Sequence, residues 1–125
     1  MRRFLVLAAA MTLAACGSDS VGPNGSIVGT YDLQRINGSA LPVAVTSGVA
    51  LDSDVLTLNN DGSYSDVAQF SDGTVSPEQG FFDESNGFIT FSPTTSGLSQ
   101  YTGSISGSIL TTTFSDGTVE VYQRR

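Results

Sequence analysis

The hexapeptide Phe70-Ser-Asp-Gly-Thr-Val75, written FSDGTV, occurs a second time at Phe114–Val119 in this chain of 125 residues. Asp-Gly pairs favour type I′ turns, because both central residues of that turn need a positive φ. Each copy therefore predicts a β-hairpin tip in which the Phe faces the Val, a favourable aromatic and β-branched pair. The residues around the two copies do not match, which favours one local structure used twice over duplication of a longer unit.

Short runs rich in Thr, Val, Ile, Tyr and Phe continue on both sides of these hairpins. They are separated by Gly next to Asp, Asn or Ser, which is typical of strands and tight turns. No stretch after residue 25 sustains the i, i+3, i+4 apolar period of a helix. The predicted strands are Ile27–Ile36, Val43–Val45, Val55–Asn59, Ser63–Phe70, Thr74–Ser76, Gly80–Asp83, Phe88–Phe91, Ser99–Ser106, Ile109–Phe114 and Thr118–Gln123.

Apolar and polar residues alternate within several of these strands. Tyr101 and Ile105, for example, alternate with Thr102 and Ser104. One buried and one solvated face is typical of antiparallel sheets. About eight short antiparallel strands must cover or close their edges. The sequence therefore predicts an all-β domain that forms a small antiparallel up-and-down barrel, with a β-sandwich as the alternative.

The N-terminal residues have the pattern of an export signal. A positively charged start, Met1-Arg2-Arg3, precedes the segment Phe4–Ala15, which is apolar except for Thr12. This segment is too short to cross a bilayer core of about 30 Å as a helix. A short apolar run that follows basic residues and ends in small residues is typical of a secretory signal peptide.

The end of this segment, Leu13-Ala14-Ala15-Cys16, resembles the lipobox of bacterial lipoproteins at all four positions. The resemblance implies lipidation of Cys16, cleavage after Ala15 and a stable membrane anchor through the acyl chains. Cys16 is the only cysteine, so no intramolecular disulfide can form. In Gram-negative lipoproteins an Asp after the lipidated cysteine favours inner-membrane retention. Gly17 stands there instead, which by resemblance favours the outer membrane of the cell envelope.

Composition divides the rest of the chain into a tether and one acidic domain. Residues 1–15 are the predicted signal peptide, and 16–25 combine the lipidated Cys16 with a flexible Gly- and Pro-containing linker. Residues 26–125 form the predicted β-barrel domain, expected to be a monomer. After cleavage only three arginines remain against 12 acidic residues, with no Lys or His. Such a charge repels nucleic acid, and we expect no nucleic-acid partner.

A second resemblance concerns the barrel. Gly29-Thr30-Tyr31 is similar to the Gly-x-Trp motif of lipocalins, with Tyr in place of Trp, and Asn37–Pro42 resembles the NGxxLP segment of small lipocalin-like lipoproteins. In lipocalins an arginine of the last strand packs on that Trp and closes one barrel end. The resemblance therefore implies barrel closure by Gly29, Tyr31 and Arg124. Tyr31 as an ordinary core residue is the alternative.

Few residues in the chain can carry chemistry. Without His, and with Cys16 lipidated, no Ser–His or Cys–His arrangement is possible. The two pairs Asp52-x-Asp54 and Asp83-Glu84 lie next to Ser, Asn and Gly, and we interpret them as solvated loop charges rather than acid–base pairs. The sequence predicts no enzyme activity, no metal site and no cofactor.

Two functions remain open for such a domain. A barrel of eight strands holds one small ligand or is filled by its own side chains. In the first case the protein binds a small apolar ligand, with Tyr31, Tyr64, Phe91 and Tyr101 as the candidate contacts. In the second it is a non-catalytic envelope protein that contacts other proteins. The candidate surface is then Thr74–Phe82, where Pro77 is expected to interrupt pairing and Phe81 and Phe82 point to opposite sides.

Overall fold

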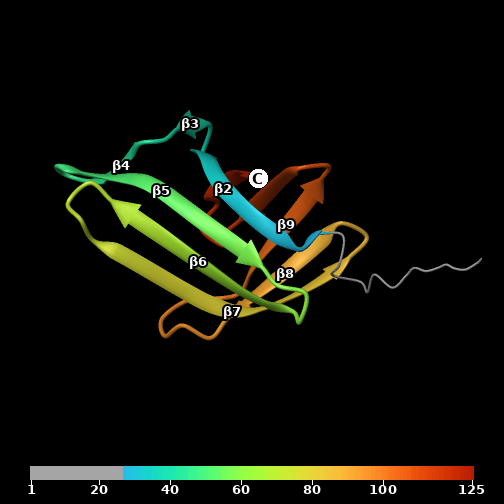
Figure 1. Cartoon of the computed structure of the whole chain (residues 1–125). Coiled ribbons are helices and arrows are strands. Elements are labelled where there is room, and N and C mark those ends of the chain that lie inside the picture. Colours follow the sequence, from blue (N-terminus) through green and yellow to red (C-terminus); the bar gives the residue numbers. More distant parts are fainter. Residues whose placement is uncertain (1–26) are drawn as a thin grey trace, which may run out of the picture.

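Eight antiparallel strands form a closed barrel in the computed structural model, which describes residues 27–125 (Figure 1). Neighbouring strands pair in the order β2-β11-β10-β9-β8-β7-β6-β5, and β5 pairs back onto β2. This closure confirms the predicted small all-β barrel and excludes the sandwich. The eight strands are β2 (Gly29–Ile36), β5 (Val49–Leu58), β6 (Ser63–Phe70), β7 (Val75–Ser85), β8 (Phe88–Pro93), β9 (Tyr101–Ser106), β10 (Ile109–Thr113) and β11 (Val119–Arg124).

Two short strands extend the sheet where β2 and β5 separate. Strands β2 and β5 pair with each other only between Gly29–Asp32 and Val55–Leu58. Beyond that, β2 pairs with β3 (Ser39–Ala40) and β5 pairs with β4 (Val43–Thr46). The predicted signal peptide (1–15) and the predicted segment 16–25, with Cys16 and the tether, lie outside the described residues. Within 27–125, no helix has the length and apolar character needed to span a bilayer.

The hexapeptide forms the same turn twice, although not the predicted one. Phe70 N donates to Thr74 O and Gly73 N donates to Phe70 O, both at 2.9 Å, and Phe114, Gly117 and Thr118 repeat these bonds. The loop therefore has three residues, with Gly73 and Gly117 at a φ of about 90°, as in a type I turn followed by a G1 bulge. The predicted Phe–Val pairing is wrong by one residue, because the Ser before Asp-Gly belongs to the turn.

Strand β7 corrects a second prediction. The predicted strands Thr74–Ser76 and Gly80–Asp83 merge, except for Thr74, into one continuous strand that begins at Val75, and Pro77 pairs with Val67 inside it. Gln79 N donates to Thr95 Oγ1 and Gln79 O accepts from Thr94 N, both in the loop after β8. Residues two apart on a strand point their backbone groups to the same side, so the nitrogen of Pro77 also faces that loop. Pairing with β8 begins only at Gly80. The missing N–H of Pro77 therefore costs no ladder bond, since that edge of β7 is unpaired there.

The strands run between two different barrel ends. The start of β2, the end of β5 and the β7–β8 turn lie at one end, shown at the right of Figure 1. The β6–β7 hairpin lies at the other end, at the left of Figure 1, and by strand alternation so do the β10–β11 hairpin and the 94–100 loop. Between them lies a core of inward side chains: Ile27, Tyr31, Leu33, Leu51, Leu56, Leu58, Tyr64, Phe82, Ile89, Phe91, Tyr101, Leu110 and Tyr122.

Candidate ligand-binding site

Arg124 covers the barrel end at which β2 begins. Its guanidinium carbon lies 5.4 Å from the centre of the fully buried Tyr31 ring, and its Nη2 donates to Val28 O at 2.7 Å. A Cβ on Gly29 would lie 3.2 Å from Arg124 Nε, so a residue without a side chain allows this approach. We call this end, with Gly29, Tyr31 and Arg124, the closed end of the barrel.

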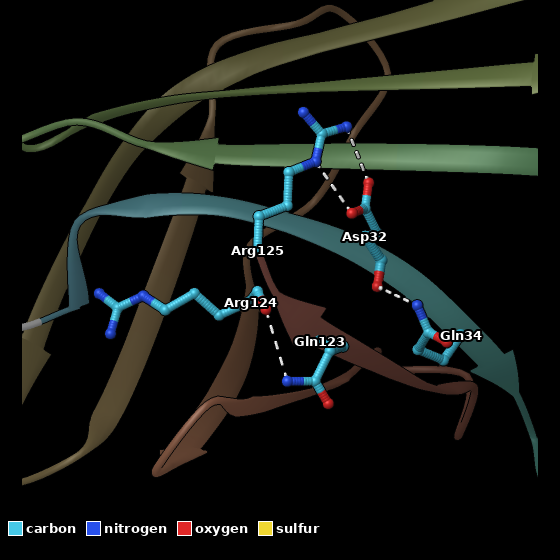
Figure 2. A network of polar contacts seen from close by, with 5 residues as sticks. All are labelled: Asp32, Gln34, Gln123, Arg124 and Arg125. Atoms are coloured by element: carbon cyan, nitrogen blue, oxygen red, sulfur yellow. Dashed lines mark hydrogen bonds and ion pairs between the residues drawn. The ribbon is translucent and has the colours of Figure 1, made fainter.

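The next residue, Arg125, points away from Arg124 (Figure 2). Its Nε and Nη2 each donate to one carboxylate oxygen of Asp32 at 2.9 Å, and both side chains are well exposed. The hydrogen bonds and charge of Arg125 lower the pKa of Asp32. Exposed ion pairs contribute little to stability, so this pair is a suitable reference for Arg124.

We expect Arg124→Ala to lower the free energy of unfolding by about 1–3 kcal/mol, through the lost cation–π contact and charged hydrogen bond. Arg125→Ala should cost less than about 1 kcal/mol. Denaturant unfolding of the two variants against the parent measures both values. Equal losses would show that the contact between Arg124 and Tyr31 does not close the barrel.

Four aromatic rings form a column along the barrel interior. Phe114 stacks on Tyr101 with ring centres 4.4 Å apart, Tyr101 stacks on Phe91 at 4.8 Å, and Tyr64 meets Phe91 edge-on at 5.2 Å. Such pairs add about 0.5–1.5 kcal/mol each beyond the area that they bury. The column fills the middle of the barrel and ends at Phe114, beside the second FSDGTV turn.

A pocket of about 450 Å³ opens at the end opposite Arg124. Its walls come from the loop between β8 and β9, the start of β9, the β10–β11 hairpin and β7. We call it the mouth pocket, lined by Glu78, Gly97, Leu98, Ser99, Gln100, Tyr101, Phe114, Ser115, Asp116, Thr118 and Glu120. The second hexapeptide thus forms a ligand-accessible wall as well as a turn.

Glu78 joins the aromatic column to the mouth pocket. Its Oε2 accepts hydrogen bonds from Tyr64 Oη at 2.5 Å and from Tyr101 Oη at 2.7 Å. Burial, together with the neighbouring Glu78, raises the pKa of both phenols, so they remain protonated donors. Both donors use the same oxygen of Glu78, so this carboxyl group joins the two phenols.

Two further carboxyl groups lie deeper in the barrel. Asp54 and Asp66 are only 7% and 9% exposed, and Asp66 pairs with Glu78 across β6 and β7. Burial raises the pKa of each, and the neighbouring Asp54 raises the pKa of Asp66 further. One oxygen of each, Oδ1, has no hydrogen-bond partner. The interpretation of Asp54 as a solvated loop charge is therefore wrong, because it lies on the inward face of β5.

Glu120 completes the interior group of acids. Its Oε1 accepts a hydrogen bond from Tyr122 Oη at 2.9 Å. Burial and the nearby charge of Asp54 raise the pKa of Glu120 to about 7, against the lowering effect of the Tyr122 hydrogen bond. We call Asp54, Asp66, Glu78 and Glu120 the acid cluster. In residues 27–125, no three acidic side chains are arranged to hold one metal ion.

The four predicted ligand contacts occupy different parts of the barrel. Tyr101 lines the mouth pocket, whereas Tyr64 and Phe91 lie behind it in the column and Tyr31 lies at the closed end. Of the predicted partner surface, Phe82 is buried in the core and Phe81 is 59% exposed. Phe114, Asp66, Glu78 and Glu120 were not among the predicted site residues.

A signal for the acid cluster was present in the alternation of the strands. Asp54 has the same parity as Leu56 and Leu58, and Glu120 has the same parity as Tyr122. Side chains two residues apart on a strand share a face. Each acid is thus two positions from a buried residue, as are Asp66 from Tyr64 and Glu78 from Gly80.

Comparison with known proteins adds no assignment to this geometry. No protein-family model, no curated protein and no solved structure matches the chain.

Proposed function

We propose that this protein is a lipid-anchored protein of the bacterial envelope whose lipocalin-like barrel binds one small ligand. The mouth pocket carries this proposal, because it is a concave site in which Leu98, Tyr101 and Phe114 lie among polar and acidic side chains. A volume of about 450 Å³ falls within the range of about 300–1,000 Å³ that small-molecule sites occupy. The lipobox resemblance of Leu13–Cys16 supports the anchor, and Gly17 supports an outer-membrane location.

The two barrel ends favour binding at the mouth pocket alone. Arg124 and Tyr31 occupy the closed end, and the aromatic column fills the middle. A ligand would therefore sit above the column, with its apolar part against Tyr101, Phe114 and Leu98. Leu98 is 47% exposed, and a ligand would shield it from water.

The alternative function, protein contact through exposed aromatic residues, has weaker support. Phe81 and Phe88 are 59% and 71% exposed on neighbouring strands. Phe81 pairs with Ser92 whereas Phe88 pairs with Ser85. This register separates the two rings by four residues, about 13 Å along the strands, so they do not form one continuous patch.

A native mass spectrum tests the proposed ligand. The soluble piece Gly17–Arg125, which contains every described strand, would be incubated with an extract of its own host and repurified. We expect an added mass that disappears on denaturation. A bare polypeptide mass over several extracts would contradict ligand binding and favour the alternative. The mass of the membrane-extracted full chain, against a Cys16→Ala variant, tests the acyl anchor separately.

A further inference from the structure

We propose that the mouth pocket selects an organic cation: a protonated amine carried on a planar apolar body. This inference rests on the proposed ligand-binding function and names the chemical class of the ligand. It follows from the charge, the burial and the ring geometry at this end of the barrel.

The charge of the pocket is of one sign. Glu78, Asp116 and Glu120 line it, and none of its described lining residues is basic. Arg124 lies at the closed end and Arg125 pairs with Asp32 on the outer surface. Low-dielectric walls that carry one sign of charge concentrate the field and attract the opposite charge. An anionic ligand would meet repulsion in this pocket, and a cation would meet attraction.

Two buried carboxyl groups lie behind this lining. Asp54 and Asp66 are more than nine-tenths buried, interact electrostatically with Glu78, and each has an Oδ1 without a hydrogen-bond partner. An ammonium group carries several N–H donors and no acceptor. It therefore complements a pocket whose lining carboxyl groups, Glu78, Asp116 and Glu120, are accompanied by no basic lining residue.

The ring geometry defines the rest of the ligand. Tyr101 and Phe114 lie nearly parallel in the column, with an angle of 29° between their planes, and both line the pocket. Because Phe91 and Phe114 cover the two faces of Tyr101, the pocket presents the outer face of Phe114 and the edge of Tyr101. A flat body can stack on Phe114, where a cation gains a further attraction. The ligand would thus place its amine toward Glu78 and Glu120 and its flat body against the rings.

Proton exchange gives the inference a distinctive signature. A bound cation favours ionised carboxylates, so binding should release protons from Glu120, and from Asp54 and Asp66 behind it, and tighten as the pH rises. The groups that interact with Glu120 are Asp54 on β5, Asp66 on β6, Glu78 on β7, Thr112 on β10 and Tyr122 on β11. On β2, Ile36 pairs with Glu120, and the exposed Arg35 precedes it opposite Val121. A purely apolar ligand should bind equally at each pH.

The test compares three probes that share one ring and differ in their end group. Tyramine carries an amine, tyrosol a hydroxyl, and 4-hydroxyphenylacetate a carboxylate. Calorimetric titration into the full chain in a non-ionic detergent should show tyramine binding at least about tenfold tighter than tyrosol, a difference of about 1.4 kcal/mol. The acetate should not bind, and tyramine affinity should rise between about pH 6 and pH 8.

Matched variants locate the binding. Glu120→Gln and Glu78→Gln keep the side-chain size, and each should weaken tyramine binding about tenfold. Asp83→Asn, which removes an exposed carboxylate on the outer face of β7, should leave it unchanged. Melting curves verify that each variant folds. If one glutamine variant does not fold, the affinity of the other alone locates the binding.

The outcomes separate the two proposals. Equal affinity for tyrosol and tyramine would overturn the cation while ligand binding stands. No binding of any probe at about 10 mM, weaker than ordinary ligand affinities, would also overturn it, and the native mass spectrum would still decide the proposed function. Displacement of tyramine by equimolar Ca²⁺ would overturn it in favour of a metal site.

Discussion

The free energy of unfolding should fall as the pH rises from about 5 to about 8, by about 1.4 kcal/mol per pH unit for each proton that the native barrel retains. Asp54, Asp66 and Glu120 have folded-state pKa values raised by burial. The native state therefore binds more protons than the unfolded chain above the unfolded pKa values of about 4. Their contribution is fully present below that pH and is lost as the pH rises through the folded pKa values.

Asp66→Asn should reduce this slope by about one proton, because the amide cannot ionise and still offers a donor to Asp54. Urea unfolding at several pH values measures the slope directly. Asp83→Asn on the outer face is the control and should keep the parent slope. A parent whose stability does not change in this range would show that Asp54, Asp66 and Glu120 are ionised in the native state. The lowered pKa values of Asp61, Asp72 and Asp116 change the free energy of unfolding only at lower pH.

Gly80→Ala should destabilise the barrel by about 3 kcal/mol or more, at the upper end of overpacking effects. A Cβ at this position would lie 2.4 Å from Ser92 O, 2.8 Å from Pro93 Cα and 2.8 Å from Tyr64 Cε1. Two of these atoms belong to the backbone of β8, which cannot move without breaking its pairing with β7. The third belongs to the ring that donates to Glu78.

Gln79→Ala is the matched control for this substitution. Gln79 is exposed beside Gly80, and its recorded hydrogen bonds use backbone atoms that alanine keeps. Thermal unfolding of both variants should show a large loss for Gly80→Ala and little change for Gln79→Ala. If Gly80→Ala melts close to the parent, β7 and β8 do not approach as closely as the structure has them.

Much of the fold follows from local patterns in the sequence. Asn86-Gly87 has the two positive φ values that an Asn-Gly type I′ turn requires. The strand Ser63–Phe70 has its predicted bounds, because alternation and flanking turn residues agree there. The FSDGTV loops differ from the prediction by one residue, since Asp72 and Asp116 accept a bond from the N–H two residues on and draw the preceding Ser into the turn.

The candidate site was harder to predict because it breaks the usual correlation between polarity and exposure. Asp54 was interpreted as a solvated charge from its residue type, because charged residues are seldom buried, and nothing in the residue type of Asp66 pointed to burial either. Barrel closure overrides this correlation between charge and exposure, because it places every second residue of a strand inside the barrel, whatever its polarity. The packing constraint at Gly80 could not be predicted for a related reason. Gly80 was placed at the start of a strand, and only the spatial approach of β8 and Tyr64 shows why no side chain fits.

The closed end has a consequence for how a ligand would arrive. The described chain enters the barrel there, at Ile27, and the mouth pocket opens at the other end. With an acyl anchor on Cys16, residues 17–26 would hold the closed end within about 35 Å of the bilayer. The pocket would then lie at the barrel end farther from the anchor, within reach of solutes that diffuse through the surrounding water.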